Sequence, residues 1–141
     1  MKVLGKIQRK NWKLWLLKAR DNFQSNIEIN LDHDSFLKEF VELLKKFKFN
    51  EKLILFPDPE FVPFWSYEFR KKMNIPPEAS IVVENLVEFE EFTGKIFVMK
   101  SLPAEQYFIV PYNKKWIVVK HHEDYWIIFG YHEFIENFKK W

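Results

Sequence analysis

Cysteine is absent from this 141-residue chain, and glycine occurs only three times. Without cysteine there is no disulfide framework, no thiol nucleophile and no thiolate metal site. Three scattered glycines form neither a GxGxxG motif nor a P-loop, so the chain has no glycine-rich cradle for a nucleotide phosphate. The GxSxG motif of serine hydrolases is missing too. These absences argue against the common nucleotide-dependent and nucleophilic enzymes.

Long apolar runs are also missing. The most apolar early segment, Leu14 to Leu17, is flanked by Lys13 and Lys18, and no stretch approaches the roughly 20 apolar residues that span a bilayer. The basic start is not followed by the apolar region and cleavage site of a secretion signal. We therefore expect a cytoplasmic protein with no transmembrane segment.

Aromatic side chains are abundant, at 19% of the residues, with 16 Phe and 6 Trp. A chain of this length is typical of one domain and buries enough surface for a sizeable core. We predict a single domain over residues 1–141, with no linker or internal repeat. It divides into a basic amphipathic helix (1–24), a mixed helix and strand region (25–95), and an antiparallel meander with a terminal helix (96–141).

Hydrophobic periodicity predicts the elements of the first two regions. A helical stripe over 7–23 contains Trp12 and Trp15, and a second helix follows the N-cap candidates of residues 32–35. Strands are expected at 27–30, 53–56 and 80–83, and a third helix from Phe64 to Met73. A short helix over 84–92 is expected to end at Gly94, because glycine is common just after a helix C-terminus.

The last third contains four β-prone runs, at 96–100, 107–110, 116–120 and 125–129, and a terminal helix over 131–141. The short connections between the later runs favour antiparallel hairpins. We therefore predict an α+β fold in which N-terminal helices pack on a four- to five-stranded, mainly antiparallel sheet, with a short C-terminal helix.

The turn between the last two strands contains two of the four histidines. Its polar residues are of the types that commonly form a turn between two strands, and they do not match the HExxH motif. We therefore assign no metal ligand and no cofactor. Loops on a rigid scaffold often hold functional residues. We predict a partner-binding surface at this turn and its following strand, formed by His121, His122, Glu123, Asp124 and Trp126.

An acidic stripe follows the strand at 80–83. Glu84, Glu88 and Glu91 are spaced i, i+4 and i+7, which places them on one helix face. Such a stripe is either a solvated face or a surface that docks a basic protein. We add these three residues to the predicted partner-binding surface and assign no catalytic residue.

Charge is distributed unevenly along the chain. Residues 1–20 contain seven basic side chains and no acid, and since the whole chain carries +2, residues 21–141 carry −5. A basic helix with two Trp is typical either of packing on its own domain or of binding nucleic acid or an anionic surface. The residues of this alternative are Arg9, Lys10, Lys13, Lys18 and Arg20.

The succession Tyr107-Phe-Ile-Val-Pro111, Lys115-Trp116-Ile-Val-Val, His121-His122-Glu123-Asp124 and Tyr125-Trp-Ile-Ile-Phe-Gly130 resembles the closing hairpins of small bacterial toxin-immunity proteins. The resemblance covers about the last 35 residues. It implies an intracellular inhibitor that binds one cognate toxin and has no catalytic residues.

Our first hypothesis is therefore a non-enzymatic protein-binding domain, in the narrower form an immunity-type inhibitor with an unidentified protein partner. The alternatives are binding of nucleic acid or an anionic surface through the basic helix, and a small enzyme that uses surface histidines. Homo-oligomerisation through Trp12 and Trp15 is compatible with each of them.

Overall fold

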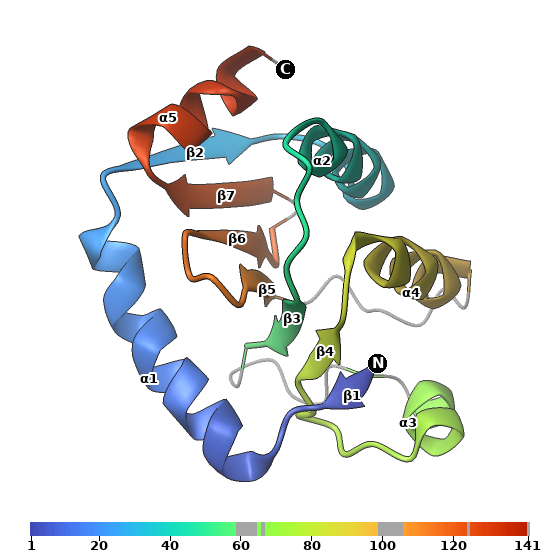
Figure 1. Ribbon diagram of the computed structural model, residues 1–141. Helices are drawn as coiled ribbons and strands as arrows, with labels where there is room; N and C mark the ends of the chain where they lie inside the picture. The colour runs from blue at the N-terminus through green and yellow to red at the C-terminus, as the bar shows by residue number, and fades with distance from the viewer. Residues whose placement is uncertain (59–64, 66, 99–105, 124, 141) are drawn as a thin grey trace.

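Seven strands form one antiparallel sheet in the computed structural model, which describes residues 1–58, 65, 67–98, 106–123 and 125–140 (Figure 1). The strands are β1 (Lys2–Val3), β2 (Ser25–Ile29), β3 (Leu53–Pro57), β4 (Ile81–Val83), β5 (Tyr107–Pro111), β6 (Trp116–His121) and β7 (Tyr125–Gly130). Their order across the sheet is β1-β4-β3-β5-β6-β7-β2. The α+β class is confirmed, and the expected four to five strands were too few.

Five α-helices and a final 3-10 helix accompany the sheet in the described residues. They are α1 (Lys6–Asn22), α2 (His33–Lys46), α3 (Tyr67–Met73), α4 (Leu86–Val98), α5 (His132–Glu136) and η2 (Phe138–Lys140). The predicted terminal helix is thus divided at Asn137, and Trp141 lies outside the described residues. The strands of all three predicted regions join one sheet.

The central strands are buried on both faces, which explains their near-continuous apolar sequences. Successive side chains of a strand point to opposite faces, and the packing follows this alternation. In β3, Leu53 and Leu55 belong to one core cluster, whereas Ile54 and Phe56 belong to the other. The same alternation occurs in β5 and β6.

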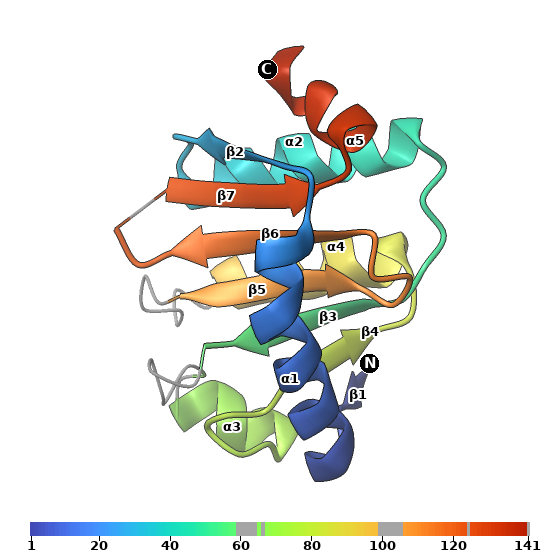
Figure 2. The same ribbon diagram turned by 90° about the vertical axis from the view of Figure 1, so that its left-hand side faces the viewer.

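Of the helices in the described residues, α1 is the one that packs on the first face of the sheet (Figure 2). Leu16 and Ala19 are buried there, and Trp12, Trp15 and Phe23 pack against the same cluster. The stripe that the sequence predicts is therefore a core contact. Because one helix covers little of β7, Ile127 and Phe129 on this face stay half-buried.

Helices α2 and α4 pack on the other face. Helix α2 begins after the N-cap Asp32, whose carboxylate accepts a hydrogen bond from the Ser35 backbone N–H at 3.1 Å, as the sequence indicates. Its Phe36 and Phe40 are fully buried, as is Phe89 of α4. Beside α2, Phe138 of η2 stacks on Phe40.

Two predictions around Gly94 were wrong. Helix α4 continues through Gly94 to Val98, so it neither ends near Phe92 nor gives way to a strand at 96–100; residues 99–100 lie outside the described part of the chain. Gly94 does not have the positive φ of a helix-ending glycine. The β-branched and aromatic side chains of this segment favoured a strand by propensity, which the helical context overrides.

Strand register defines two ends of the sheet. Pro57 pairs with Tyr107, Tyr107 with Lys120, and His121 with Tyr125, so these residues share one end, here called the His121 end. Leu53 pairs with both Val83 and Pro111, and Trp116 pairs with Gly130. These residues form the opposite Gly130 end.

Candidate interaction surfaces

The β6–β7 turn lies at the His121 end of the sheet. The strand ladder stops at His121, so the alternation of side chains between the two faces does not extend to His122. The rings of His121 and His122 stack, with centroids 4.2 Å apart. His121 also stacks on Tyr125 at 4.3 Å, and its Nδ1 accepts a hydrogen bond from the Glu123 backbone N–H at 3.1 Å. His122 and Glu123 are exposed. Asp124 lies outside the described residues.

Residues next to β3 and β5 of the same chain contact this turn. His122 Nδ1 lies 3.3 Å from Gln106 Oε1, and Gln106 Nε2 donates a hydrogen bond of 2.6 Å to Asp58 Oδ2. The Asp58 backbone N–H donates to the Gln106 carbonyl at 3.1 Å. The described residues of the turn are therefore connected to the ends of β3 and β5 by polar contacts.

The acidic residues lie elsewhere. Glu84 directly follows Val83 at the Gly130 end of the sheet, so the length of a five-residue strand, about 17 Å, separates it from the β6–β7 turn. Glu88 lies in the first turn of α4, which begins at the same end. The structure does not join Glu84 and Glu88 to the β6–β7 turn in one surface.

Glu84 and Glu88 have local partners. The Lys52 amino group lies 3.6 Å from Glu84. Glu88 accepts hydrogen bonds from the Met1 amino group and from the Glu84 backbone N–H, and the first of these contacts lowers the pKa of the Glu88 carboxyl. The Glu88 N–H in turn donates to the Asn85 side chain at 2.8 Å, which caps α4. Glu88 therefore organises the start of this helix.

Glu91 is exposed on α4 and lines a small cavity of about 290 Å³ between α3 and α4, together with Phe69, Phe92 and others. It does not continue the line of Glu84, which precedes the helix. Glu88 lines the same cavity, so the structure brings Glu88 and Glu91 of the predicted stripe together on α4, whereas Glu84 lies at the end of the preceding strand.

Trp126 belongs to the core. Its side chain is fully buried, stacks on Phe36 with centroids 3.9 Å apart, and contacts His33 at 5.4 Å. Its predicted place on a partner-binding surface is therefore wrong. In the alternation of β7, Trp126 points to the α2 face, whereas Tyr125 and Ile127 point to the other.

A polar pair beside Trp126, formed by His33 and Tyr107, was not predicted from the sequence. His33 Nε2 lies 2.8 Å from the Tyr107 hydroxyl, and Tyr107 is buried. Burial raises the pKa of Tyr107 well above its usual value, and the Asp34 carboxylate adds to the shift. A hydroxyl that stays protonated is able to donate to His33, so the pair anchors the start of α2 to β5. His33 had given no signal beyond its place among N-cap residues.

The basic residues of α1 divide into two groups. Arg9 and Arg20 are half-buried: Arg9 contacts Glu78, with Nη1 3.8 Å from Oε1, and the Arg20 guanidinium lies 5.7 Å from the Phe108 ring. Lys10, Lys13 and Lys18 are exposed. The structure therefore leaves the lysines of the predicted anionic-surface site in solvent and turns its two arginines toward the sheet.

The exposed face of α1 also contains large aliphatic side chains. Ile7 is 77% exposed, Leu14 52% and Leu17 53%. Their spacing of seven and three residues places them along one line of the helix, opposite the Trp12 and Trp15 stripe. The spacing of these three residues is present in the sequence, but the stripe with Trp12 and Trp15 is the stronger helical pattern and was the one interpreted.

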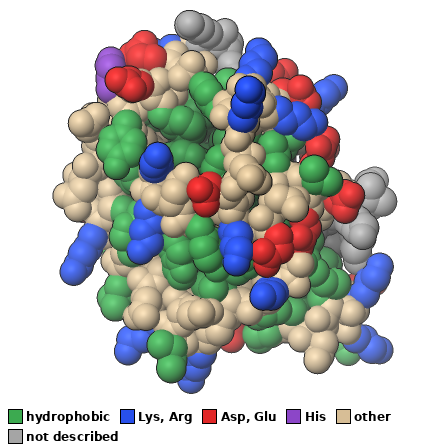
Figure 3. All heavy atoms as spheres, in the orientation of Figure 1, with side chains coloured by type: hydrophobic (Ala, Val, Ile, Leu, Met, Phe, Trp, Pro, Cys, Tyr) green, Lys and Arg blue, Asp and Glu red, His purple; other side chains and the backbone are tan. Residues whose placement is uncertain are grey.

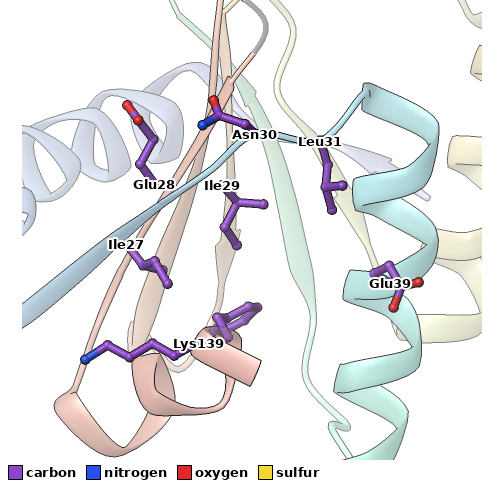
Figure 4. A pocket seen from close by; sticks show the side chains of 8 residues that line it. Ile27, Glu28, Ile29, Asn30, Leu31, Glu39 and Lys139 are labelled. Atoms are coloured by element: carbon purple, nitrogen blue, oxygen red, sulfur yellow. The ribbon is translucent and has the colours of Figure 1, made fainter. Parts of the chain in front are cut away.

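A groove of about 550 Å³ lies beside the edge strand β2, bounded by α2 and η2 (Figure 4). Its lining residues are Ile27, Glu28, Ile29, Asn30, Leu31, Glu39, Phe138 and Lys139. No sequence pattern indicates this groove, because it depends on which strand lies at the edge of the sheet.

Metal and membrane sites have little support in the described ranges. Within them, no three His, Asp or Glu side chains gather as a metal-binding group. No helix in this part of the chain combines the length and the apolar character that a bilayer crossing requires.

Comparison of the chain with protein-family models, with curated proteins and with solved structures finds no match in any of the three.

Proposed function

We propose that this protein is a non-enzymatic protein-binding domain and that its contact surface is the outer face of α1. The observation that supports this proposal is the exposed line of Ile7, Leu14 and Leu17. Large aliphatic side chains surrounded by charge have the arrangement of a protein interface, with an apolar centre and a polar rim. We call these residues and the neighbouring lysines the α1 surface, formed by Lys6, Ile7, Lys10, Lys13, Leu14, Leu17 and Lys18.

The charge of the α1 surface defines the partner. Its four lysines are all exposed, and Figure 3 shows basic side chains with hydrophobic ones between them along the lower left margin, where α1 lies. Asp21 is the one acidic residue within α1. A partner with an acidic rim around an apolar centre complements this surface and associates faster at low salt.

The test begins with affinity capture after nuclease treatment and continues with the purified partner. We expect the triple variant Ile7→Ser, Leu14→Ser, Leu17→Ser to lower the affinity roughly tenfold or more, because it removes the apolar centre. A matched control, Tyr67→Ser with Val87→Ser, removes exposed apolar side chains on α3 and α4 and should leave the affinity unchanged. Calorimetric titration measures both.

An unchanged affinity in the triple variant would overturn the placement on α1. Loss of affinity in His122→Ala with Glu123→Ala instead would move the contact to the β6–β7 turn, the surface that the sequence predicts. Because all substituted side chains are exposed, each substitution should change the free energy of unfolding by less than about 0.5 kcal/mol, so every variant should stay folded. Denaturant titration checks this.

The resemblance of the last 35 residues to toxin-immunity proteins supports a narrower form of the proposal, in which the partner is one cognate toxin and binding inhibits it. The polar geometry of the β6–β7 turn is compatible with a further contact to such a partner. Co-expression of the two proteins, with growth as the readout, tests this form once the partner is identified.

Binding to an anionic surface is the second candidate, and the four lysines of the α1 surface favour it. Trp12 and Trp15 pack on the sheet, so the aromatic stacking of single-stranded nucleic-acid binding is not offered by this helix. Phosphatidylcholine vesicles with and without phosphatidylserine, and duplex DNA, are the probes. Binding to the anionic vesicles or to the DNA itself, with an affinity that falls steeply with salt, would favour this candidate over a protein partner.

A further inference from the structure

We propose that the free edge of β2 binds an extended segment of a partner protein, which adds to the sheet as an eighth strand. Strand β2 ends the strand order and pairs only with β7. The backbone N–H and C=O groups on its other edge therefore have no strand partner within the described residues. Such an edge is a template for an added strand.

The shape of the groove beside β2 supports this mode of binding. Five consecutive residues, Ile27 to Leu31, line it. Since successive side chains of a strand point to opposite faces, a groove over one face would be lined by alternate residues. Lining by a continuous run indicates that the groove follows the edge of the strand, as Figure 4 shows for β2 and the chain after it.

The position of the groove limits the length of the added segment. Near the start of β2, Ser25 Oγ lies 3.4 Å from His132 Nδ1, and the His132 N–H donates to Gln24. Helix α5 therefore covers this part of the edge. The open part consists of Ile27 to Ile29 of β2 and the two residues that follow the strand, Asn30 and Leu31. Together they fit a segment of about five residues, or about 16 Å. The opposite edge strand, β1, has only two residues.

The lining defines the chemistry of the segment. Ile27, Ile29, Leu31 and Phe138 provide apolar surface, so alternate residues of the segment are expected to be apolar. The carboxylates of Glu28 and Glu39 make no ion pair within the described residues, whereas Lys139 is paired with Glu136 at 2.8 Å. The unpaired charge of the groove is therefore negative, and the segment is expected to contain lysine or arginine.

This site is independent of the α1 surface. The residues of the groove come from β2, α2 and η2, and its apolar side chains belong to or pack against the core cluster on the α2 face. A variant of one site therefore leaves the other intact, and the two proposals fail or succeed separately.

The experiment is a selection from a displayed library of random seven-residue peptides, performed on the natural chain. We expect the enriched peptides to alternate apolar and other residues and to contain lysine or arginine. Their affinity should fall roughly tenfold or more on the charge-reversed variant Glu28→Lys with Glu39→Lys. The matched control, Glu51→Lys with Glu68→Lys, changes two exposed acids outside the groove and should bind like the natural chain.

N-methylation of the best synthetic peptide distinguishes strand addition from side-chain binding. If the peptide pairs with β2, methylation of every second amide should abolish binding, and methylation of the intervening amides should have little effect. Amide shifts in NMR spectra should concentrate on residues 27–31. Equal effects of all methylations, or shifts confined to α1 or the β6–β7 turn, would overturn the proposal.

A second copy of the chain is the competing occupant of this edge. Sedimentation equilibrium of the natural chain should give the monomer mass. A dimer that dissociates in the Glu28→Lys, Glu39→Lys variant would show that the edge pairs with another copy and would overturn the proposal of a partner segment. A library that yields no peptide sensitive to this variant would overturn it as well.

Discussion

Trp126 is the residue at which a surface interpretation and a core interpretation give opposite predictions. It lies in β7 next to the polar β6–β7 turn, yet its ring stacks on Phe36 and contacts His33 and Tyr107. Aromatic pairs of this kind add to the free energy gained by burial. Its contribution is therefore to stability.

We expect Trp126→Ala to lower the free energy of unfolding by about 3–5 kcal/mol, because it leaves a cavity beneath α2. Trp126→Phe should cost much less. Tyr67→Ala, at a 69% exposed aromatic, serves as the control and should change the value by less than about 0.5 kcal/mol. Urea unfolding measures all three, and a stable Trp126→Ala protein would contradict the core assignment.

Asp32 links the start of α2 to pH. The hydrogen bond from Ser35 lowers the pKa of the Asp32 carboxyl, so the charged cap stabilises the fold at pH values above the unfolded pKa, about 3.9. This contribution to stability is lost as the pH falls through the lower pKa that Asp32 has in the folded state. We expect Asp32→Ala to lower the urea midpoint at pH 7 and to have less effect near pH 2.

Asp32→Asn is the control for this prediction, because asparagine caps helices nearly as well as aspartate but does not titrate. Its midpoint at pH 7 should lie close to that of the natural chain, and its own contribution should not vary with pH. A loss at pH 7 as large as that of Asp32→Ala would indicate that charge, not the cap hydrogen bond, stabilises this helix.

Helix α4 offers a test at the scale of an element. Gly94 lies inside the helix without a positive φ, and an added Cβ would meet no atom within 4 Å. We expect Gly94→Ala to raise the free energy of unfolding by about 0.4–1 kcal/mol, since alanine reduces the freedom of the unfolded chain. A destabilised variant would instead support the helix end that the sequence predicts there. Thermal unfolding measures the difference.

The sequence predicts elements well where local chemistry defines them. The cap of α2 was readable from Asp32 and Ser35, and β5, β6 and β7 from their apolar runs and short connections. Strand β1, with only Lys2 and Val3, has no periodicity to detect. The Gly94 prediction was wrong because a glycine that ends a helix and one inside a helix look alike in sequence.

The order of the strands in the sheet could not be predicted from the sequence, for a different reason. Strand β1 pairs with β4, β3 with β5 and β2 with β7, so half of the neighbouring pairs in the described sheet join strands that are not consecutive in the chain. The groove at β2 and the separation of Glu84 from the β6–β7 turn both follow from this order. The candidate site residues could therefore be identified by type, but their grouping could not be predicted.

At the scale of the whole molecule, α1 is the cover of one face of the sheet. Without residues 1–24, the apolar side chains that α1 shields would meet water: Ile54, Phe56, Val82, Phe108, Val110, Ile117 and Val119. We expect the chain 25–141 to bind a hydrophobic dye and to aggregate. Size-exclusion chromatography and dye fluorescence measure this.

A monomeric, cooperatively folding 25–141 chain would contradict this prediction. The expected result also affects tests of the basic helix. Deleting it would remove any binding function together with the fold, so substitution of exposed residues such as Ile7 and Lys10 is the informative experiment.

The position of α1 between the two edge strands has a consequence for biosynthesis. Lys2 pairs with Val82, in the middle of the chain, and Ile27 pairs with Ile128, near its end, so both strands flanking α1 pair with strands that are made later (Figure 1). The helix, about 25 Å long, spans a sheet about 29 Å wide between them. On the ribosome residues 1–29 are made before these partners, so α1 cannot complete its contacts until β5 and β6 have emerged, and β2 cannot pair until β7 has emerged. During most of translation the basic helix with its two tryptophans is therefore accessible to chaperones.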